Sequence, residues 1–156
     1  MDIPILFEND RFCAINKPAG IVVNRASTVH EETIQDWAEK SIHFENTSDP
    51  AQQAFRDRAG IVHRIDKETS GILLIAKTND TFLLFQRAFF DHVMEKTYTA
   101  FVHGKVTPAE GEINAPSEGC PGTKNNSVSS PGEKNPLHVT SVRPSEHMPI
   151  PSPVIR

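Results

Sequence analysis

The chain has 156 residues and a formal net charge of −4, a length that suits one domain with a buried core. Its longest apolar run, residues 72–76, is too short to span a membrane, and the N-terminal residues lack the pattern of a signal peptide. Cys13 and Cys120 lack the CxxC spacing of a zinc site, so no metal is expected. Two cysteines without a disulfide framework favour a reducing, cytoplasmic location.

The composition changes sharply along the chain. All nine Phe, the single Trp and the single Tyr lie at or before Phe101, whereas nine of the twelve Pro lie between Pro108 and Pro153. Large aromatic residues supply much of a core, and proline interrupts helices and sheets. We therefore expect residues 1–116 to hold the folded domain, and residues 117–156 to form a Pro/Ser-rich tail that is disordered or the product of a shifted reading frame.

The first part of the chain predicts a hairpin-like antiparallel start, because short apolar segments alternate with turn residues. The predicted extended segments are residues 3–7, 12–15 and 21–23, with a turn at residues 8–10 and a Pro/Gly bend at residues 17–20.

Helical spacing of apolar residues follows. It predicts a helix over residues 32–42 and a longer one over residues 79–93, the second capped by Asn79. The apolar stripe of the longer helix is predicted to consist of Phe82, Phe85, Phe89 and Val93.

Further strands are predicted at residues 61–63, 72–76 and 95–103, and residues 43–58 are expected to form a loop with a short helical turn. This order favours an α+β fold with a mixed, largely antiparallel sheet and flanking helices.

Residues 63–71, HRIDKETSG, place Asp66 among cationic and turn-forming residues just before an apolar strand. A carboxylate can act as a nucleophile when it is held still and its charge is supported, and Arg64 and Lys67 can favour the ionised form of Asp66. From the residues alone, the alternative is that Asp66 is an ordinary acid that caps a turn, which is common between two strands. A hydrolase triad of Ser70, His63 and Asp66 is rejected, because the three lie within eight residues and no GxSxG elbow is present.

The run HRID followed by TSG resembles the catalytic motif of the RluA-type RNA pseudouridine synthases. Two further segments resemble motifs of the same family in the same order: AINKPAGIVV at residues 14–23, and EKTYTAFVHG at residues 95–104. Three ordered motifs over about 100 residues form a specific signal.

The resemblance implies that Asp66 is the nucleophile acting on a target uridine. Arg64 would fill the space left by the extruded base, and Tyr98 would stack on the flipped uracil. The partner would be ribosomal or transfer RNA, the reaction would need no cofactor, and the protein is expected to be a monomer. The bend at residues 17–20 is expected to be structural, and His63 to be packed rather than catalytic.

The family's domain continues past the third motif with a segment like TGRTHQIR, which residues 117–156 do not contain. The fold is therefore expected to be incomplete at the C-terminus. The charge total does not predict a broad basic surface, although residues 56–77 carry a local surplus of two positive charges. A truncated, catalytically inactive remnant that binds RNA weakly, or has no function, stays as the alternative.

Overall fold

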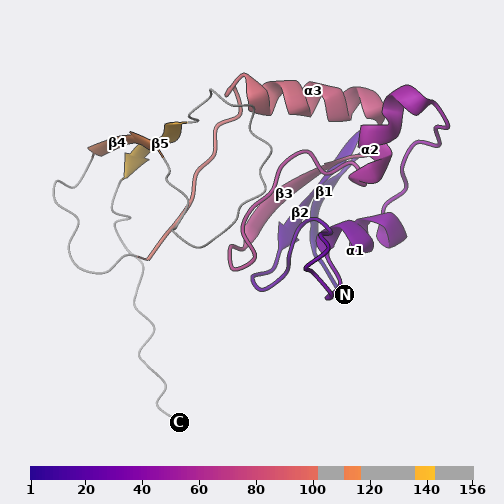
Figure 1. Cartoon of the computed structure of the whole chain (residues 1–156), viewed down its shortest axis with the longest axis horizontal. Coiled ribbons are helices and arrows are strands. Elements are labelled where there is room, and N and C mark those ends of the chain that lie inside the picture. Colours follow the sequence, from indigo (N-terminus) through magenta and orange to yellow (C-terminus); the bar gives the residue numbers. More distant parts are fainter. Residues whose placement is uncertain (102–110, 117–135, 143–156) are drawn as a thin grey trace, which may run out of the picture. The chain divides into compact units, whose positions relative to one another are not determined.

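The computed structural model describes residues 1–101, 111–116 and 136–142 (Figure 1). The chain divides into two compact units, Met1–Thr97 and Tyr98–Arg156. The first unit combines a three-stranded antiparallel sheet with three α-helices and one 3-10 helix, so the predicted α+β class is confirmed. Among the described residues, no helix is both long and apolar enough to cross a membrane.

The sheet of the first unit has the order β1-β2-β3, with every neighbouring pair antiparallel. Its strands are β1 (Ile5–Glu8), β2 (Phe12–Lys17) and β3 (Gly71–Ala76). Asn9 makes the turn between β1 and β2, because its side-chain oxygen accepts hydrogen bonds from the N–H groups of Arg11 and Phe12. The predicted hairpin of the first two extended segments is therefore confirmed.

Helix α1 (Ile34–Ser41) covers one face of the sheet. Thr33 caps it by accepting a hydrogen bond from the N–H of Asp36, and the Asp36 carboxylate accepts one in return from the Thr33 main chain, which is a capping box. The helix packs with the side chains of β2 and β3 in one buried cluster, which includes Cys13, Ile15, Ile34, Trp37, Ala38, Leu73 and Ile75.

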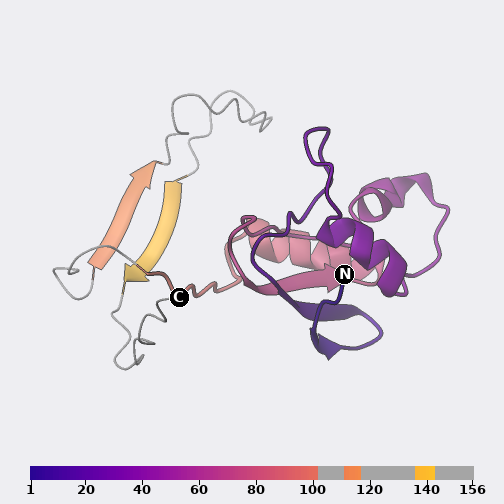
Figure 2. The ribbon, with the colours of Figure 1, turned by 90° about the horizontal axis from the view of Figure 1, so that it is seen from below.

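Helix α3 (Asn79–Phe90) covers the opposite face of β3, because Ala76 and Leu74 pack with Phe82 in a second apolar cluster. Figures 1 and 2 show β3 between α1 and α3. The same cluster contains Phe55 of the short helix α2 (Gln53–Asp57), which follows the 3-10 helix η1 (Pro50–Gln52). The loop with a short helical turn predicted for this region is confirmed.

Two details of α3 differ from the prediction. Thr78, not Asn79, is the N-cap, since the Thr78 hydroxyl accepts a hydrogen bond from the N–H of Thr81. The helix also ends at Phe90, because His92 adopts a left-handed backbone with φ of 56°. Val93 consequently lies outside the helix and is 70% exposed, so it does not belong to the apolar stripe.

Three predicted strands are wrong in whole or in part. Residues 21–23 form no strand, because the carbonyl groups of Val22 and Val23 accept hydrogen bonds from the first turn of α1 instead. Residues 61–63 contribute only a single bridge, from Ile61 to Ile75. Residues 95–101 alternate in sequence but pair with no described strand, and residues 102–103 lie outside the described residues.

In the second unit, β4 (Gly111–Pro116) pairs antiparallel with β5 (Pro136–Val142). Strand β5 falls within residues 117–156, the segment predicted to be a tail, and the rest of that segment lies outside the described residues. The boundary of the tail stays a prediction.

Candidate active site

Gly60, which precedes the candidate site in the chain, lies close to the main chain of β3. The carbonyl oxygen of Gly60 accepts a hydrogen bond from the N–H of Ala76 at 2.9 Å. A Cβ at Gly60 would lie 1.9 Å from the carbonyl oxygen of Ala76, and the φ of Gly60 is 67°. Both the space and the backbone angle therefore require glycine at this position.

Asp66 then lies on an exposed turn that follows the buried Ile65. Arg64 and Asp66 are exposed, whereas Ile65 between them is buried in the main core. The N–H of Thr69 donates to the carbonyl oxygen of Asp66 at 3.1 Å, which closes the turn. Gly71 begins β3 with a φ of 132°, a conformation that side chains disfavour. The buried Ile65 thus directs its neighbours on both sides toward solvent.

Lys17 lies fully buried beneath this turn. Its Nζ donates to the carbonyl oxygen of Pro18 at 2.8 Å and to that of Lys67 at 3.0 Å. The N–H of Gly20 donates to the same carbonyl of Lys67 at 2.8 Å. The bend at residues 17–20 therefore holds the Asp66 turn through two hydrogen bonds to one oxygen atom.

The charge of Lys17 also acts on the turn. Burial lowers the pKa of the Lys17 ammonium, while the carboxylates of Glu68 and Asp66 act in the opposite direction. A buried cation therefore faces two acidic side chains of the turn.

His63, three residues before Asp66, contacts two other elements. Its Nε2 accepts a hydrogen bond from the N–H of Leu74 in β3 at 3.0 Å. Its ring stacks on Phe89 of α3, with ring centres 4.6 Å apart and planes 30° apart. Burial, followed by the nearby charge of Lys96, lowers the pKa of His63 to about 4. At neutral pH the ring is therefore uncharged, with the acceptor at Nε2.

The cations at the surface of the turn differ in their partners. Lys67 pairs with Glu31 at 3.2 Å, whereas Arg64 has no ion pair among the residues that the structure describes. Arg64 is thus exposed and available to an incoming ligand.

A pocket of about 200 Å³ lies beside Lys67, lined by Val22, Thr28, Val29, His30, Glu31 and Lys67.

Tyr98 is the first residue of the second unit, and its side chain is 61% exposed. Asp66 and Arg64 belong to the first unit, where only one residue separates them along the chain. The stacking role of Tyr98 next to Asp66 stays a prediction.

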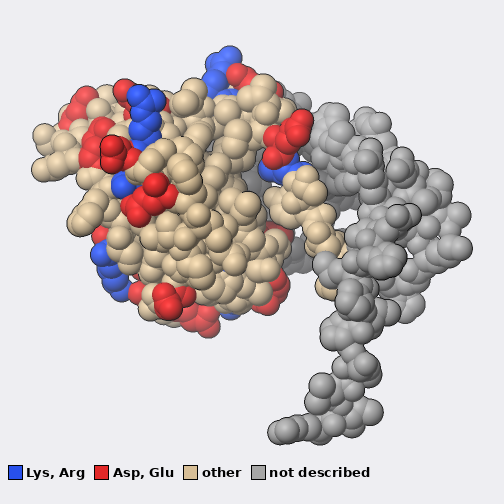
Figure 3. All heavy atoms as spheres, turned by 180° about the vertical axis from the view of Figure 1, so that it is seen from behind, with Lys and Arg blue, Asp and Glu red and all other residues tan. Residues whose placement is uncertain are grey.

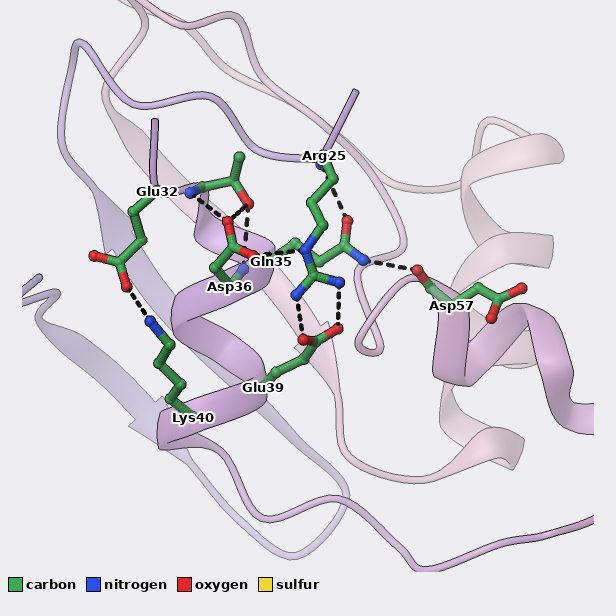
Figure 4. A network of polar contacts seen from close by, with 8 residues as sticks. Arg25, Glu32, Gln35, Asp36, Glu39, Lys40 and Asp57 are labelled. Atoms are coloured by element: carbon green, nitrogen blue, oxygen red, sulfur yellow. Dashed lines mark hydrogen bonds and ion pairs between the residues drawn. The ribbon is translucent and has the colours of Figure 1, made fainter. Parts of the chain in front are cut away.

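The segment between the bend and α1 is fastened by a polar network (Figure 4). Arg25 bonds to the Asp36 carboxylate at 2.6 Å and to both carboxylate oxygens of Glu39. The side chain of Gln35 accepts from the N–H of Arg25 and donates to the carbonyl oxygen of Asp57 at 2.7 Å. This network ties the segment that follows Gly20 to both α1 and α2.

Charges of both signs share the surface. Figure 3 shows acidic and basic side chains interspersed over one face of the molecule, on a surface that is mostly uncharged. Within the described part of the chain, no group of three or more His, Cys, Asp or Glu side chains could hold a metal ion.

Sequence reasoning missed two of these residues, since Lys17 was expected only as part of a bend and His63 only as a packed side chain. A signal for Lys17 was present: Cys13, Ile15 and Lys17 alternate along β2, so they share the face that is fully buried. No local signal identifies the hydrogen bond of His63, because its donor lies in the next strand.

Comparison with known proteins gives a consistent result. The family model described as RNA pseudouridylate synthase matches residues 11–150. An RNA pseudouridine synthase of Helicobacter pylori, described as uncharacterized, is 35% identical over 102 residues, which cover 65% of this chain and 30% of that protein. The ribosomal large subunit pseudouridine synthase D of Zymomonas mobilis is 35% identical over 117 residues, covering 74% of this chain and 35% of that protein.

The tRNA pseudouridine synthase C of Haemophilus ducreyi is 34% identical over 120 residues, covering 74% of this chain and 43% of that protein. A solved structure, human RNA Pseudouridylate Synthase Domain Containing 4, matches with a TM-score of 0.40 and 22% identity, over 58% of this chain and 30% of that one. The chain thus spans between 30% and 43% of the length of these relatives. The match of the family model over residues 11–150 shows that the chain belongs to the RNA pseudouridylate synthase family.

Proposed function

We propose that this chain isomerises uridine to pseudouridine in structured RNA, with Asp66 as the nucleophile. The observation that carries the proposal is the setting of Asp66 in a chain of this family. Its side chain is exposed on a turn whose main chain is held by the buried Lys17. A rigid support with an exposed carboxylate is what covalent catalysis by an acid needs.

The reaction is an internal rearrangement. The bond from the sugar to N1 of uracil breaks, the base rotates while it stays bound, and a new bond forms from the sugar to carbon 5. The hydrogen on carbon 5 leaves as a proton, and N1 gains a proton, so the atoms and electrons balance without a further reagent. The site must keep the detached base close and exclude water until the new bond forms.

Arg64 and Tyr98 take the roles that the family resemblance implies. A base inside a duplex is not accessible to a side chain, so the uridine must leave the stack. Arg64 is exposed two residues before Asp66, and its guanidinium suits the space that the base vacates. Tyr98 offers an aromatic face for the uracil, and a stacking contact accepts any pyrimidine.

The names of the relatives specify the ribosomal large subunit for one and tRNA for another. We propose one of these two RNA classes as the substrate. The expected monomeric state and cytoplasmic location stay predictions.

The decisive experiment measures tritium release from RNA whose uridines carry tritium at carbon 5. Wild-type protein and Asp66→Asn are compared on ribosomal RNA and on a tRNA pool. We expect release by the wild type on one of the two, and a fall to background in Asp66→Asn. Asp80→Asn is the matched control, because Asp80 is an exposed acid at the start of α3 and should leave the rate unchanged.

Background release by the wild type on both RNA classes would contradict the proposal. The alternative function, a remnant that binds RNA weakly without turnover, would then be measured directly. RNA retained on a filter by both wild type and Asp66→Asn, without tritium release, would support that alternative. A thermal melt without a cooperative transition would indicate a product that has no stable fold.

A further inference from the structure

His63 occupies a position at which a strand would otherwise continue. Two N–H groups of β3, those of Ala76 and Leu74, lie two residues apart and therefore point to the same edge of the strand. The N–H of Ala76 is paired with the main-chain carbonyl of Gly60. The N–H of Leu74 is paired with the side chain of His63. The imidazole thus replaces the main-chain acceptor at the point where the chain leaves the sheet.

With this replacement, the main chain after Ile61 does not have to stay paired with β3. A regular strand at residues 61–63 would keep the chain paired along β3, and only the bridge from Ile61 to Ile75 forms. Because the His63 side chain supplies the acceptor, the main chain can turn away while the N–H of Leu74 stays bonded. The Asp66 turn begins at this departure.

The position of the imidazole is itself fixed. Its ring stacks on Phe89 of α3, and the residue is half-buried. An acceptor at Nε2 requires the neutral ring with its hydrogen on Nδ1. The burial that lowers the pKa of His63 keeps this form populated at neutral pH.

Asp66 therefore lies between two fixed points. Before it, His63 is attached to β3 and α3. After it, the carbonyl oxygen of Lys67 is held by Lys17 and Gly20. Only two residues separate His63 from Asp66 along the chain.

We propose that His63 is a positioning residue, whose hydrogen bond from Leu74 sets the orientation of Asp66 for the isomerisation. The inference rests on the proposed function. Catalysis depends steeply on placement, since a displacement of about 1 Å can cost about a hundredfold in rate. His63 itself need not touch the RNA.

Two variants separate the hydrogen bond from the packing. His63→Phe keeps an aromatic ring against Phe89 and removes the acceptor. His63→Gln keeps an acceptor oxygen at a similar reach and removes the ring. Amide hydrogen exchange at Leu74 reports on the hydrogen bond from its N–H to His63. Exchange at Thr69 reports on the turn, because the N–H of Thr69 bonds to the carbonyl of Asp66.

We expect faster exchange at Leu74 and Thr69 in His63→Phe, by about tenfold for the loss of one hydrogen bond. The kcat for uridine should fall by about tenfold or more, with the KM for RNA within about twofold. His63→Gln should recover most of both effects. The N–H of Ile42 at the end of α1 serves as the reference amide and should not change in either variant.

Unchanged exchange at Leu74 or Thr69 in His63→Phe would overturn the inference, whatever the activity. Faster exchange in His63→Phe with an unchanged kcat would also overturn it. Equal losses of kcat in His63→Phe and His63→Gln would overturn it too, because a change in packing alone explains them. An inactive wild type would instead contradict the proposed function, and the exchange at Thr69 would then decide whether His63 holds the turn.

Discussion

The ammonium nitrogen of Lys17 lies 3.0 Å from the carbonyl oxygen of Lys67, although the two residues are 50 positions apart in the chain. This contact joins the end of β2 to the residue that follows the candidate nucleophile. A buried lysine is rare because its charge is costly to remove from water, unless its hydrogen bonds are satisfied. Here the bonds to Pro18 and Lys67 hold the main chain beside Asp66.

Replacing Lys17 by Met should therefore affect activity more than stability. The variant loses two hydrogen bonds but also the cost of burying a charge, so the free energy of unfolding should change by less than about 2 kcal/mol. The rate of tritium release should fall by about tenfold or more, because the main chain of the turn loses its support. Lys40→Met is the control, since Lys40 is exposed on α1. A folded Lys17→Met protein with the wild-type rate would contradict this role.

The two glycines before the turn should respond differently to alanine. Gly20 and Gly60 both have positive φ, but a Cβ meets nothing within 4 Å at Gly20 and the Ala76 carbonyl at 1.9 Å at Gly60. Gly20→Ala should cost about 1 kcal/mol for the backbone conformation alone. Gly60→Ala should cost about 3 kcal/mol or more, because main-chain atoms must move. Urea unfolding of the two variants measures the difference, and equal costs would contradict the close approach.

Stability should fall as the pH is lowered from about 6.5 to about 4, in part because of His63. Its pKa is about 4 in the folded protein and 6.5 as an unperturbed group. Between these values the unfolded chain binds more protons, so the free energy of unfolding rises with pH. The contribution is at most about 3 kcal/mol.

Urea unfolding of wild type and His63→Gln at several pH values tests this. Carboxylates titrate in both proteins, so the comparison isolates the histidine. We expect the stability advantage of the wild type to be largest near pH 7 and to shrink toward pH 4. An advantage that stays constant over this range would contradict the pKa assigned to His63.

The contact of Arg25 with Glu39 should be worth little despite its two hydrogen bonds (Figure 4). The Arg25 side chain is 47% exposed, so water and salt weaken the attraction. A double-mutant cycle with Arg25→Ala and Glu39→Ala should give a coupling of about 0.5–1 kcal/mol, and this coupling should be smaller in 1 M salt. A coupling between Arg25 and Glu39 that does not weaken in salt would contradict the exposed character of the network.

Asp36 should contribute to acid stability in the same network. The hydrogen bonds from Thr33, followed by that from Arg25, hold the pKa of the Asp36 carboxyl well below its usual range. Stability from this group is present above the ordinary pKa of an aspartate and is lost as the pH falls below it.

Local pattern in the sequence was enough to identify several parts of this molecule. The alternation and turn residues predicted the hairpin of β1 and β2, and helical spacing located α1 and α3, since these periods follow from the geometry of each element. The HRID and TSG residues predicted an acidic turn before a buried strand, and Asp66 is exposed on such a turn.

Other features depended on which distant groups come together. Residues 21–23 look like a strand, but their carbonyls bond to the first turn of α1. Residues 61–63 look like a strand as well, but the side chain of His63 takes the place of the main chain at Leu74.

The sequence by itself determined the hairpin of β1 and β2, the helices α1 and α3, the acidic turn and the family of this protein, because period, turn chemistry and motif order are properties of neighbouring residues. Only the tertiary structure decided how the turn is supported. Lys17 bonds to the carbonyl of Lys67 in the turn, and His63 bonds to the N–H of Leu74 in β3. The partner of a buried polar group is set by packing, which no local pattern records.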